Sequence, residues 1–193
     1  FIKQMIRLAV VGDIGSGKSY IARSFGYPVF NADDEVGKLY KNSKVIFKKL
    51  KKSLSKYIYT FPINKNELSK AILANQSNLR KIVKIIHPEI KKKMQIFLKK
   101  NKKQKIVVLD IPLLLENKIN KKDDILIFVQ SKKSEIFKRL KKRKNFNPNL
   151  IKKFKNIQLT LDYKKKKSNF IIKNNFTNTG IKRSIKSILQ EIL

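Results

Sequence analysis

Several residue types are missing from this 193-residue sequence or scarce in it. It has no cysteine, no tryptophan and a single histidine, His87. The absence of cysteine excludes a disulfide scaffold, a cysteine-ligated zinc or iron–sulfur site and a thiol nucleophile. A lone histidine excludes a metal site built from several histidines. No apolar run approaches the roughly 20 residues of a membrane span. With 41% hydrophobic residues, the chain can still bury a core, and its length suits one domain.

Acidic residues are also scarce. Thirteen Asp and Glu stand against 47 Lys and Arg, which gives a formal net charge of +34. Such a charge is typical of nucleic-acid-binding proteins, but 41 of the basic residues are Lys and only 6 are Arg, the residue best suited to bidentate phosphate and base recognition. Lys, Asn and Ile share A/T-rich codons, so compositional drift is a sufficient cause. We interpret the excess as a solvated lysine surface and expect no dedicated nucleic-acid partner.

The N-terminal segment gives no sign of a targeting signal. Residues 1–7 carry two basic residues, and the short apolar stretch after them ends at a glycine-rich loop, so we expect no signal peptide and no membrane association. We expect a cytoplasmic protein that is a monomer or a weak homo-oligomer. Because the chain begins with Phe1, Met5 is our hypothesis for the natural start.

Short β-branched runs alternate with helical patterns along the chain. Strands are expected at 6–11, 28–30, 105–110, 125–129 and 170–172. Helices are expected at 18–25, over most of 35–103, at 131–142, from Asn149 onward and at the C-terminus. Breaks in the long helical region are expected around Pro62 with 64–66, and at His87-Pro88, because the residue before proline resists helical geometry.

The last helix has a clear apolar pattern. Thr179 is its expected N-cap, and one face carries five apolar residues: Ile181, Ile185, Ile188, Leu189 and Ile192. Alternation of strands and helices predicts an α/β fold with a five-stranded parallel sheet covered on both sides. The region from about 36 to 103 is too long for one crossover helix, and we expect it to be a helical insertion.

One motif carries most of the chemistry. Residues 12–19 (GDIGSGKS) fit G-x-x-x-x-G-K-[ST] and lie between an expected strand and an expected helix, as a phosphate-binding loop requires. Its glycines allow backbone N–H groups to surround a phosphate, and the helix N-terminus adds a positive end. Lys18 can reach the β- and γ-phosphates, and the Ser19 hydroxyl can ligate magnesium. The alternative, an ordinary glycine-rich turn, does not explain the match at every fixed position.

Two acids follow other strands. Ligands of parallel sheets bind beyond the carboxyl ends of the strands, so we expect Asp33 and Asp110 to converge with Gly12 on one cleft. Asp33 is a candidate general base, and its alternative role is a helix N-cap, which Asp34 could also provide. Asp110 is a candidate magnesium ligand, often acting through water in such proteins, and its alternative role is a strand-end turn.

Two of the six arginines are spaced for phosphate binding. Arg139 and Arg143 are four residues apart, so on a helix they would share a face and could clamp phosphates when a lid closes. A solvated face is the alternative, since lysines surround them. The run 164–167 is interpreted as a solvated helix surface, and His87 alone is more often a structural histidine than a functional one.

Taken together, these residues resemble the dephospho-coenzyme A kinase family, and the likeness extends over nearly the whole chain. The loop GDIGSGKS is similar to that family's GGIGSGKS. The other matching segments are Asn31-Ala32-Asp33 at its Asp-Ala-Asp, His87-Pro88 at its His-Pro, 110–116 (DIPLLLE) at its PLLFE-type segment, Lys138-Arg139 and Arg143 at its two lid arginines, and Gln158 with Ile171-Ile172-x-Asn174 at its C-terminal pattern.

The resemblance implies a three-layer α/β/α P-loop fold in a single domain. Its core would comprise about 1–35 and 104–193, with a helical coenzyme-binding insertion at 36–103 and a lid at about 139–160. It implies transfer of the γ-phosphoryl group of ATP to the ribose 3′-hydroxyl of dephospho-coenzyme A, with Mg²⁺ at Ser19 and Asp110. Asp33 would accept the hydroxyl proton, while Lys18 and Arg143 would stabilise the transferring group. The implied ATP-binding residues are Gly12, Asp13, Ile14, Gly15, Ser16, Gly17, Lys18, Ser19, Tyr20, Arg139 and Arg143, and those for the coenzyme are Asp33, His87 and Lys164.

The sequence also departs from the family pattern. Asp13 replaces the second glycine of the loop, Asn31 replaces the first Asp of Asp-Ala-Asp, and Lys164 stands where Arg or Lys is usual. Two other functions stay open at this point. One is a P-loop kinase for a nucleoside or nucleotide, and the other is a basic nucleic-acid-binding protein that binds a nucleoside triphosphate.

Overall fold

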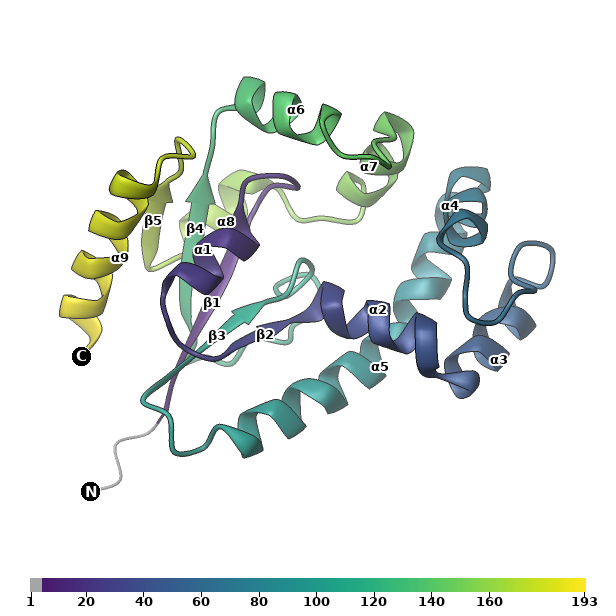
Figure 1. Cartoon of the computed structure of the whole chain (residues 1–193), viewed down its shortest axis with the longest axis horizontal. Coiled ribbons are helices and arrows are strands. Elements are labelled where there is room, and N and C mark those ends of the chain that lie inside the picture. The colour runs from purple at the N-terminus through teal and green to yellow at the C-terminus, as the bar shows by residue number, and fades with distance from the viewer. Residues whose placement is uncertain (1–4) are drawn as a thin grey trace. The chain divides into compact units, whose positions relative to one another are not determined.

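The computed structural model describes residues 5–193, and the chain folds as two compact units (Figure 1). The sheet unit contains the chain up to Asn31, Leu98–Phe146 and Leu159–Leu193, and the helical unit contains Ala32–Phe97 and Asn147–Gln158. The expectations about a signal peptide and about Met5 as the start depend on residues 1–4, which lie outside the described residues.

The elements in chain order are β1 (Ile6–Gly12), α1 (Lys18–Ser24), β2 (Val29–Asn31), α2 (Ala32–Asn42), α3 (Lys44–Ser53), α4 (Lys65–Ala74), α5 (Gln76–Lys100), β3 (Ile106–Asp110), β4 (Ile125–Gln130), α6 (Lys133–Lys141), α7 (Pro148–Lys155), α8 (Leu161–Lys167), β5 (Phe170–Lys173) and α9 (Asn178–Ile192).

The five strands form one parallel sheet in the order β2-β3-β1-β4-β5. The central strands β1 and β3 are buried along nearly their whole length, as expected for continuous apolar runs in a sheet covered on both faces. In register, Ala9 pairs with Leu109, and Asn31 pairs with Asp110. The predicted α/β class and five-stranded parallel sheet are therefore confirmed.

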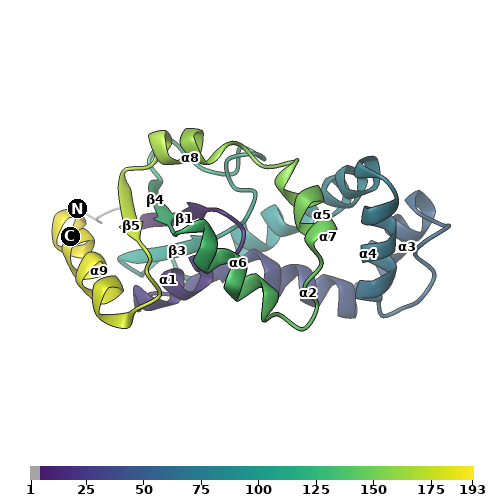
Figure 2. The same ribbon diagram turned by 90° about the horizontal axis from the view of Figure 1, so that it is seen from above.

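Helices cover both faces of the sheet. Helix α1 contacts β1 and β3, α9 contacts α1 and β5, and α8 contacts β1 and β4 from the opposite side (Figure 2). The face of α9 predicted to be apolar does join the core, with Ile181, Ile185 and Ile188 buried and Leu189 and Ile192 packed against them. The predicted N-cap was wrong by two residues: Thr177 occupies that position, and Thr179 lies inside the first turn.

The helical unit contains α2, α3, α4, most of α5, and α7. The break predicted around Pro62 with 64–66 is present at Pro62, because α3 ends at Ser53, but α4 already starts at Lys65, so the end of the break was placed two residues too late. The predicted break at His87-Pro88 was wrong, since α5 runs unbroken across Pro88. Its buried face continues on both sides of the proline, through Ile82, Ile86, Ile90 and Met94. That burial offsets the roughly 3 kcal/mol that an internal proline costs a helix.

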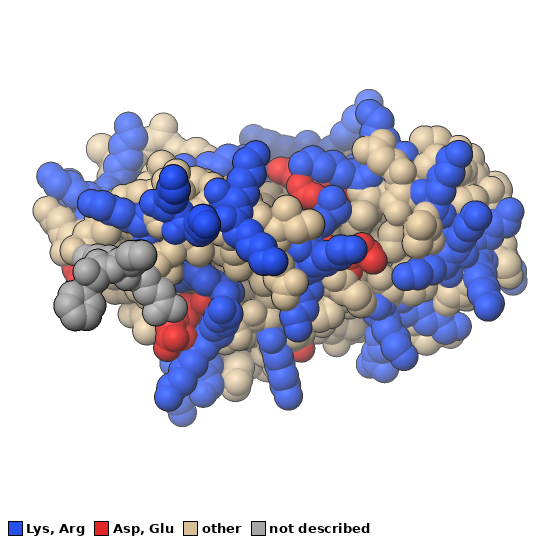
Figure 3. All heavy atoms as spheres, turned by 90° about the horizontal axis from the view of Figure 1, so that it is seen from below, with Lys and Arg blue, Asp and Glu red and all other residues tan. Residues whose placement is uncertain are grey.

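The basic side chains spread over the surface. Figure 3 shows Lys and Arg distributed across the whole visible face, with few acidic side chains between them. They do not gather into one patch on this face, which agrees with the interpretation as a solvated lysine surface. None of the helices in residues 5–193 combines the length and apolar character needed to cross a membrane.

Candidate active site

The phosphate-binding loop forms between β1 and α1, as the motif predicts. Its glycines at 12, 15 and 17 all have positive φ, and a Cβ on any of them would lie within 3.0 Å of another atom. On Gly12 the Cβ would meet the Val129 carbonyl at 2.8 Å, and on Gly15 it would meet Leu140 of α6 at 2.9 Å. The loop is therefore a closely packed cradle in which these three positions require glycine.

Lys18 opens α1 and folds back over this loop. Its Nζ donates to the Asp13 carbonyl at 2.7 Å and approaches the Gly12 carbonyl at 3.4 Å. The ammonium is thus held at the loop itself, where a phosphate chain would be bound. Ser19 follows in the first turn, and the Tyr20 hydroxyl donates to Asn178 Oδ1 at the start of α9.

Asp13 takes the place of a family glycine. Its Oδ1 accepts a hydrogen bond from the adjacent Ile14 N–H at 2.7 Å, and the residue is only 8% exposed. The carboxylate therefore turns back onto the loop backbone and engages one N–H group of the cradle.

Asp110 lies at the carboxyl end of β3 and is 3% exposed. The Asn31 side chain, its register partner on β2, donates from Nδ2 to Asp110 Oδ2 at 2.7 Å. This interaction gives Asn31 a role that the sequence did not predict: it fixes the carboxylate at the end of the sheet. The parallel pairing of the two strands was the signal that could have indicated it.

Magnesium would need hard oxygen ligands, and it usually keeps several waters with one or two protein carboxylates. The Ser19 hydroxyl and the Asp110 carboxylate are donors of this kind and both belong to the sheet unit. Residues 5–193 contain no cluster of three or more His, Cys, Asp or Glu able to hold a metal by themselves. The donor set therefore fits a metal shared with phosphate oxygens and water.

Asp33 is exposed in the first turn of α2, together with Asp34 and Glu35. It is assigned to the helical unit, but it follows Asn31 by only two residues. Successive Cα atoms are about 3.8 Å apart, so the Asp33 Cα lies within about 8 Å of the Cα at the end of β2. Glu35 has its pKa lowered by hydrogen bonding to Lys38, with Lys93 adding to the effect.

The two arginines are not on one helical face. Arg139 is exposed on α6, and its guanidinium stacks 4.2 Å from the centroid of the Phe176 ring. Helix α6 ends at Lys141, so Arg143 lies past it in a turn closed by a bond from its N–H to the Leu140 carbonyl at 3.1 Å. The shared-face expectation was wrong because it assumed a helix through both residues, whereas α6 ends two residues before Arg143.

Lys164 was expected on a solvated surface, and that interpretation was wrong. The residue is 1% exposed, and its Nζ lies 2.7 Å from Glu116 Oε1. Lys165, Lys166 and Lys167 are exposed, as expected. Contact between Lys164 and substrate stays a prediction, whereas Glu116 is a partner that sequence reasoning missed.

His87 lies within α5 in the helical unit. Its Nε2 is buried with no hydrogen-bond partner, and burial, aided by the charge of Lys91, lowers the pKa of the imidazole below its usual 6.5. Such a histidine stays neutral at pH 7.

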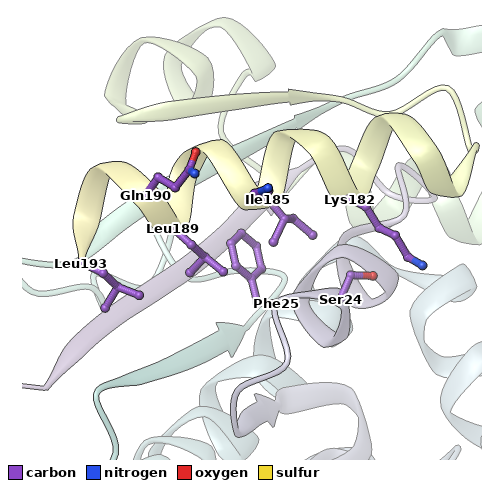
Figure 4. A pocket seen from close by; sticks show the side chains of 8 residues that line it. Ser24, Phe25, Lys182, Ile185, Leu189, Gln190 and Leu193 are labelled. Carbon is purple, nitrogen blue, oxygen red and sulfur yellow. The ribbon is translucent and has the colours of Figure 1, made fainter.

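A shallow groove of about 450 Å³ lies on the sheet unit, between the C-terminal end of α1 and α9 (Figure 4). It is mainly apolar, with Phe25, Ile185 and Leu189 facing it and Lys182 at its rim. It opens at the end of α1 opposite to the phosphate-binding loop. None of its lining residues is acidic, so it offers no general base.

Known proteins match this arrangement along almost the whole chain. The sequence model of the dephospho-CoA kinase family matches residues 6–179. The chain belongs to the dephospho-CoA kinase family. The dephospho-CoA kinase of Wolbachia pipientis wMel is 31% identical over 190 residues, covering 96% of this chain and 97% of the relative. That of Bartonella quintana (strain Toulouse) is 32% identical over 194 residues, with coverage of 96% and 97%.

Solved structures support the fold of this dephospho-CoA kinase family member. TT1252 from Thermus thermophilus aligns with a TM-score of 0.78 at 23% identity, covering 99% of this chain and 100% of that one. Dephospho-CoA kinase from Campylobacter jejuni aligns with a TM-score of 0.59 at 24% identity, covering 96% of each chain. Shikimate kinase from Acinetobacter baumannii, at 13% identity and a TM-score of 0.53, covers 99% of this chain and 94% of that one.

Proposed function

We propose that this chain transfers the γ-phosphoryl group of ATP to the ribose 3′-hydroxyl of dephospho-coenzyme A, forming coenzyme A and ADP. The observation that carries the proposal is the family match over residues 6–179, which includes an intact phosphate-binding loop. ATP-dependent phosphorylation of dephospho-CoA is the activity of that family and the last step of coenzyme A biosynthesis.

In this proposal the loop from Gly12 to Tyr20 binds the ATP phosphates, with Arg139 and Arg143 as further contacts. Lys18 and Arg143 stabilise the negative charge on the transferring group, because cations placed at the γ-phosphoryl oxygens lower the barrier to transfer. Ser19 and Asp110 would hold Mg²⁺, which would supply positive charge to neutralise the negative charge of the phosphates.

Asp33 acts as the general base in the proposed reaction. The 3′-hydroxyl oxygen bonds to the γ-phosphorus, the bond from that phosphorus to the bridging oxygen breaks, ADP leaves, and the hydroxyl proton passes to the Asp33 carboxylate. The helical region at about 36–103 binds the coenzyme, and His87 within it is one expected contact. Lys164, on α8, is the other expected contact. Residues at about 139–160 serve as the lid. A cytoplasmic location and action as a monomer or weak homo-oligomer, without a dedicated nucleic-acid partner, belong to the same proposal.

A coupled ADP-release assay tests the function. With ATP and Mg²⁺, purified protein should release ADP when dephospho-coenzyme A is added and not with a panel of nucleosides and nucleotides. Turnover of a nucleoside instead would favour another P-loop kinase. Absence of ATP turnover with every acceptor, together with salt-dependent binding of RNA or DNA, would favour a nucleic-acid-binding protein.

The Asp33→Asn variant tests the base. Its turnover should fall by at least about 100-fold, the usual range for general base catalysis, while MgATP still binds. Asp34→Asn is the matched control, because this acid neighbours Asp33 in the same helical turn and is also exposed. It should keep turnover within about twofold, and a similar value for Asp33→Asn would remove Asp33 as the base.

A further inference from the structure

One backbone carbonyl in the phosphate-binding loop is held by two side chains from distant parts of the sequence. The carbonyl oxygen of Ser16, a fully buried residue, accepts hydrogen bonds from Asn174 Nδ2 at 2.8 Å and Ser131 Oγ at 2.9 Å. Ser131 directly follows β4, and Asn174 directly follows β5. The carboxyl ends of two strands thus both bond to this single oxygen.

Asn174 is itself fixed in place. Its backbone N–H donates to the Gln130 carbonyl at 2.8 Å, and its Oδ1 accepts from the Phe176 N–H at 2.8 Å. These bonds assign the orientation of the amide, because only Nδ2 can donate to the Ser16 oxygen. The residue is 3% exposed, so loss of any of these bonds would leave a buried polar group unpaired.

Gly17 is the residue that lets Asn174 approach. A Cβ at Gly17 would lie 2.4 Å from Asn174 Nδ2 and 3.3 Å from Phe176 Cε1. The glycine therefore provides both the positive φ that ends the loop and the room for the asparagine amide. Loop and amide fit each other as one packed unit.

Fixing this carbonyl also fixes the next N–H. In a trans peptide the C=O of Ser16 and the N–H of Gly17 point in opposite directions in one plane. Two donors that hold the oxygen against the strand ends therefore turn the Gly17 N–H the other way. In loops of this motif the backbone N–H groups bind phosphate, and a carbonyl turned toward phosphate would repel it.

We propose that Asn174 and Ser131 are positioning residues for ATP binding: they hold the Ser16–Gly17 peptide in the orientation in which the loop presents N–H groups, and not a carbonyl, to the phosphates. The proposal rests on the proposed function only in taking ATP as the ligand of the loop. Asn174 also orders the Phe176 backbone, on whose ring Arg139 stacks, so one amide supports both the loop and this arginine.

The test uses isosteric changes in the full chain. Asn174→Asp keeps the acceptor for the Phe176 N–H but replaces the donor to Ser16 with an oxygen, and Ser131→Ala removes the other donor. Two other polar residues of the sheet unit supply matched controls. Asn175→Asp alters an exposed asparagine that accepts from Thr177, and Ser184→Ala removes an exposed hydroxyl that donates to the Gly180 carbonyl.

The readouts are the Kd of MgATP by titration calorimetry, the Kd of dephospho-coenzyme A and the melting temperature. We expect Ser131→Ala to weaken MgATP about fivefold, the effect of losing a hydrogen bond worth about 1 kcal/mol. Asn174→Asp should weaken it more than tenfold, and the double variant by more than the product of the two, because each donor partly covers the loss of the other. Ser131→Thr, which keeps the hydroxyl, should bind MgATP as the wild type does.

The Kd of dephospho-coenzyme A should stay within twofold of wild type in every variant. The Kd of MgATP should stay within twofold of wild type in the two control variants. If the folded fraction of the Asn174→Asp or Ser131→Ala protein falls while its MgATP Kd is unchanged, the two residues are merely structural and the proposal is overturned. Equal weakening of both ligands would overturn it as well. Failure of the proposed function looks different: the wild type would bind MgATP without phosphorylating dephospho-coenzyme A, and the MgATP comparison among variants would still decide the role of Asn174 and Ser131.

Discussion

Replacing Lys164 with methionine is expected to lower the free energy of unfolding by about 3–5 kcal/mol, the usual cost of removing one partner of a buried ion pair. The side chains of Lys164 and Glu116 are 2% and 9% exposed. A substitution at one of 41 lysines would ordinarily change stability by less than about 0.5 kcal/mol if the residue were on the surface. The prediction therefore depends on the burial of this one lysine.

The magnitude follows from the geometry. At the observed 2.7 Å between Nζ and Oε1, two unit charges attract by about 6 kcal/mol at an effective dielectric constant of about 20. Each ion loses several kcal/mol of hydration when it is buried, so the complete pair is close to balanced. Lys164→Met removes the attraction but leaves the Glu116 carboxylate buried, and its lost hydration is then uncompensated.

A double substitution separates this cause from lost packing. Glu116 also accepts a hydrogen bond from the Leu159 N–H at 3.0 Å, and glutamine can keep that bond without the charge. The Lys164→Met, Glu116→Gln variant should therefore be more stable than Lys164→Met alone, by about 2 kcal/mol. Urea unfolding followed by far-ultraviolet circular dichroism measures this difference in the free energy of unfolding. Equal m-values among the variants would show that each unfolds with the same change in exposed surface, so that their free energies can be compared.

Lys165→Met is the matched control, since Lys165 is the exposed neighbour on the same helix α8. It should change the free energy of unfolding by less than about 0.5 kcal/mol. The reasoning is refuted if Lys164→Met costs no more than Lys165→Met, or if the costs of the two substitutions simply add in the double variant.

Two further predictions concern His87 and Asp13. Burial lowers the pKa of His87 below 6.5, so the unfolded chain binds this proton first and the free energy of unfolding falls as the pH drops below about 6.5. Thermal melts from pH 7.5 to 5.5 should show a falling Tm that is flatter in His87→Gln, and equal slopes would contradict this assignment. Asp13→Asn removes a negative charge from the loop and should tighten MgATP binding about fivefold in calorimetry, an effect of about 1 kcal/mol. Unchanged or weaker binding would show that the charge of this carboxylate does not repel the bound phosphates.

The features that sequence reasoning predicted correctly are local ones. The phosphate-binding loop is a contiguous motif, and the five strands are short apolar runs whose type can be recognised without knowing their neighbours. The apolar face of α9 follows in the same way from helical periodicity. Each of these features can be recognised from residues that are close together in the sequence, in one loop, one strand or neighbouring helical turns.

The features that were missed depend on distant residues. Lys164 lies in a run of four lysines, and nothing in that run marks which of them meets Glu116, far away in the sequence. Arg7 and Asp124 form a second buried ion pair, 117 residues apart. Pro88 was expected to end a helix, because the local rule does not include the burial that continues α5 beyond it. Asn31 is explained only once the register places it opposite Asp110.

The large positive charge is best understood from the charged residues that are buried. Within residues 5–193, Lys164 is the only buried lysine, whereas four of the thirteen acids are buried as whole residues, Asp13, Glu67, Asp110 and Asp124, and the Glu116 side chain is 9% exposed. Compositional drift toward lysine acts freely on solvated positions, since a surface charge contributes little to stability. It cannot easily change a buried acid that accepts hydrogen bonds, because the groups that donate to it would be left unpaired. The buried acids therefore mark positions where the fold uses their oxygens as hydrogen-bond acceptors, and most lysines mark only exposure to water.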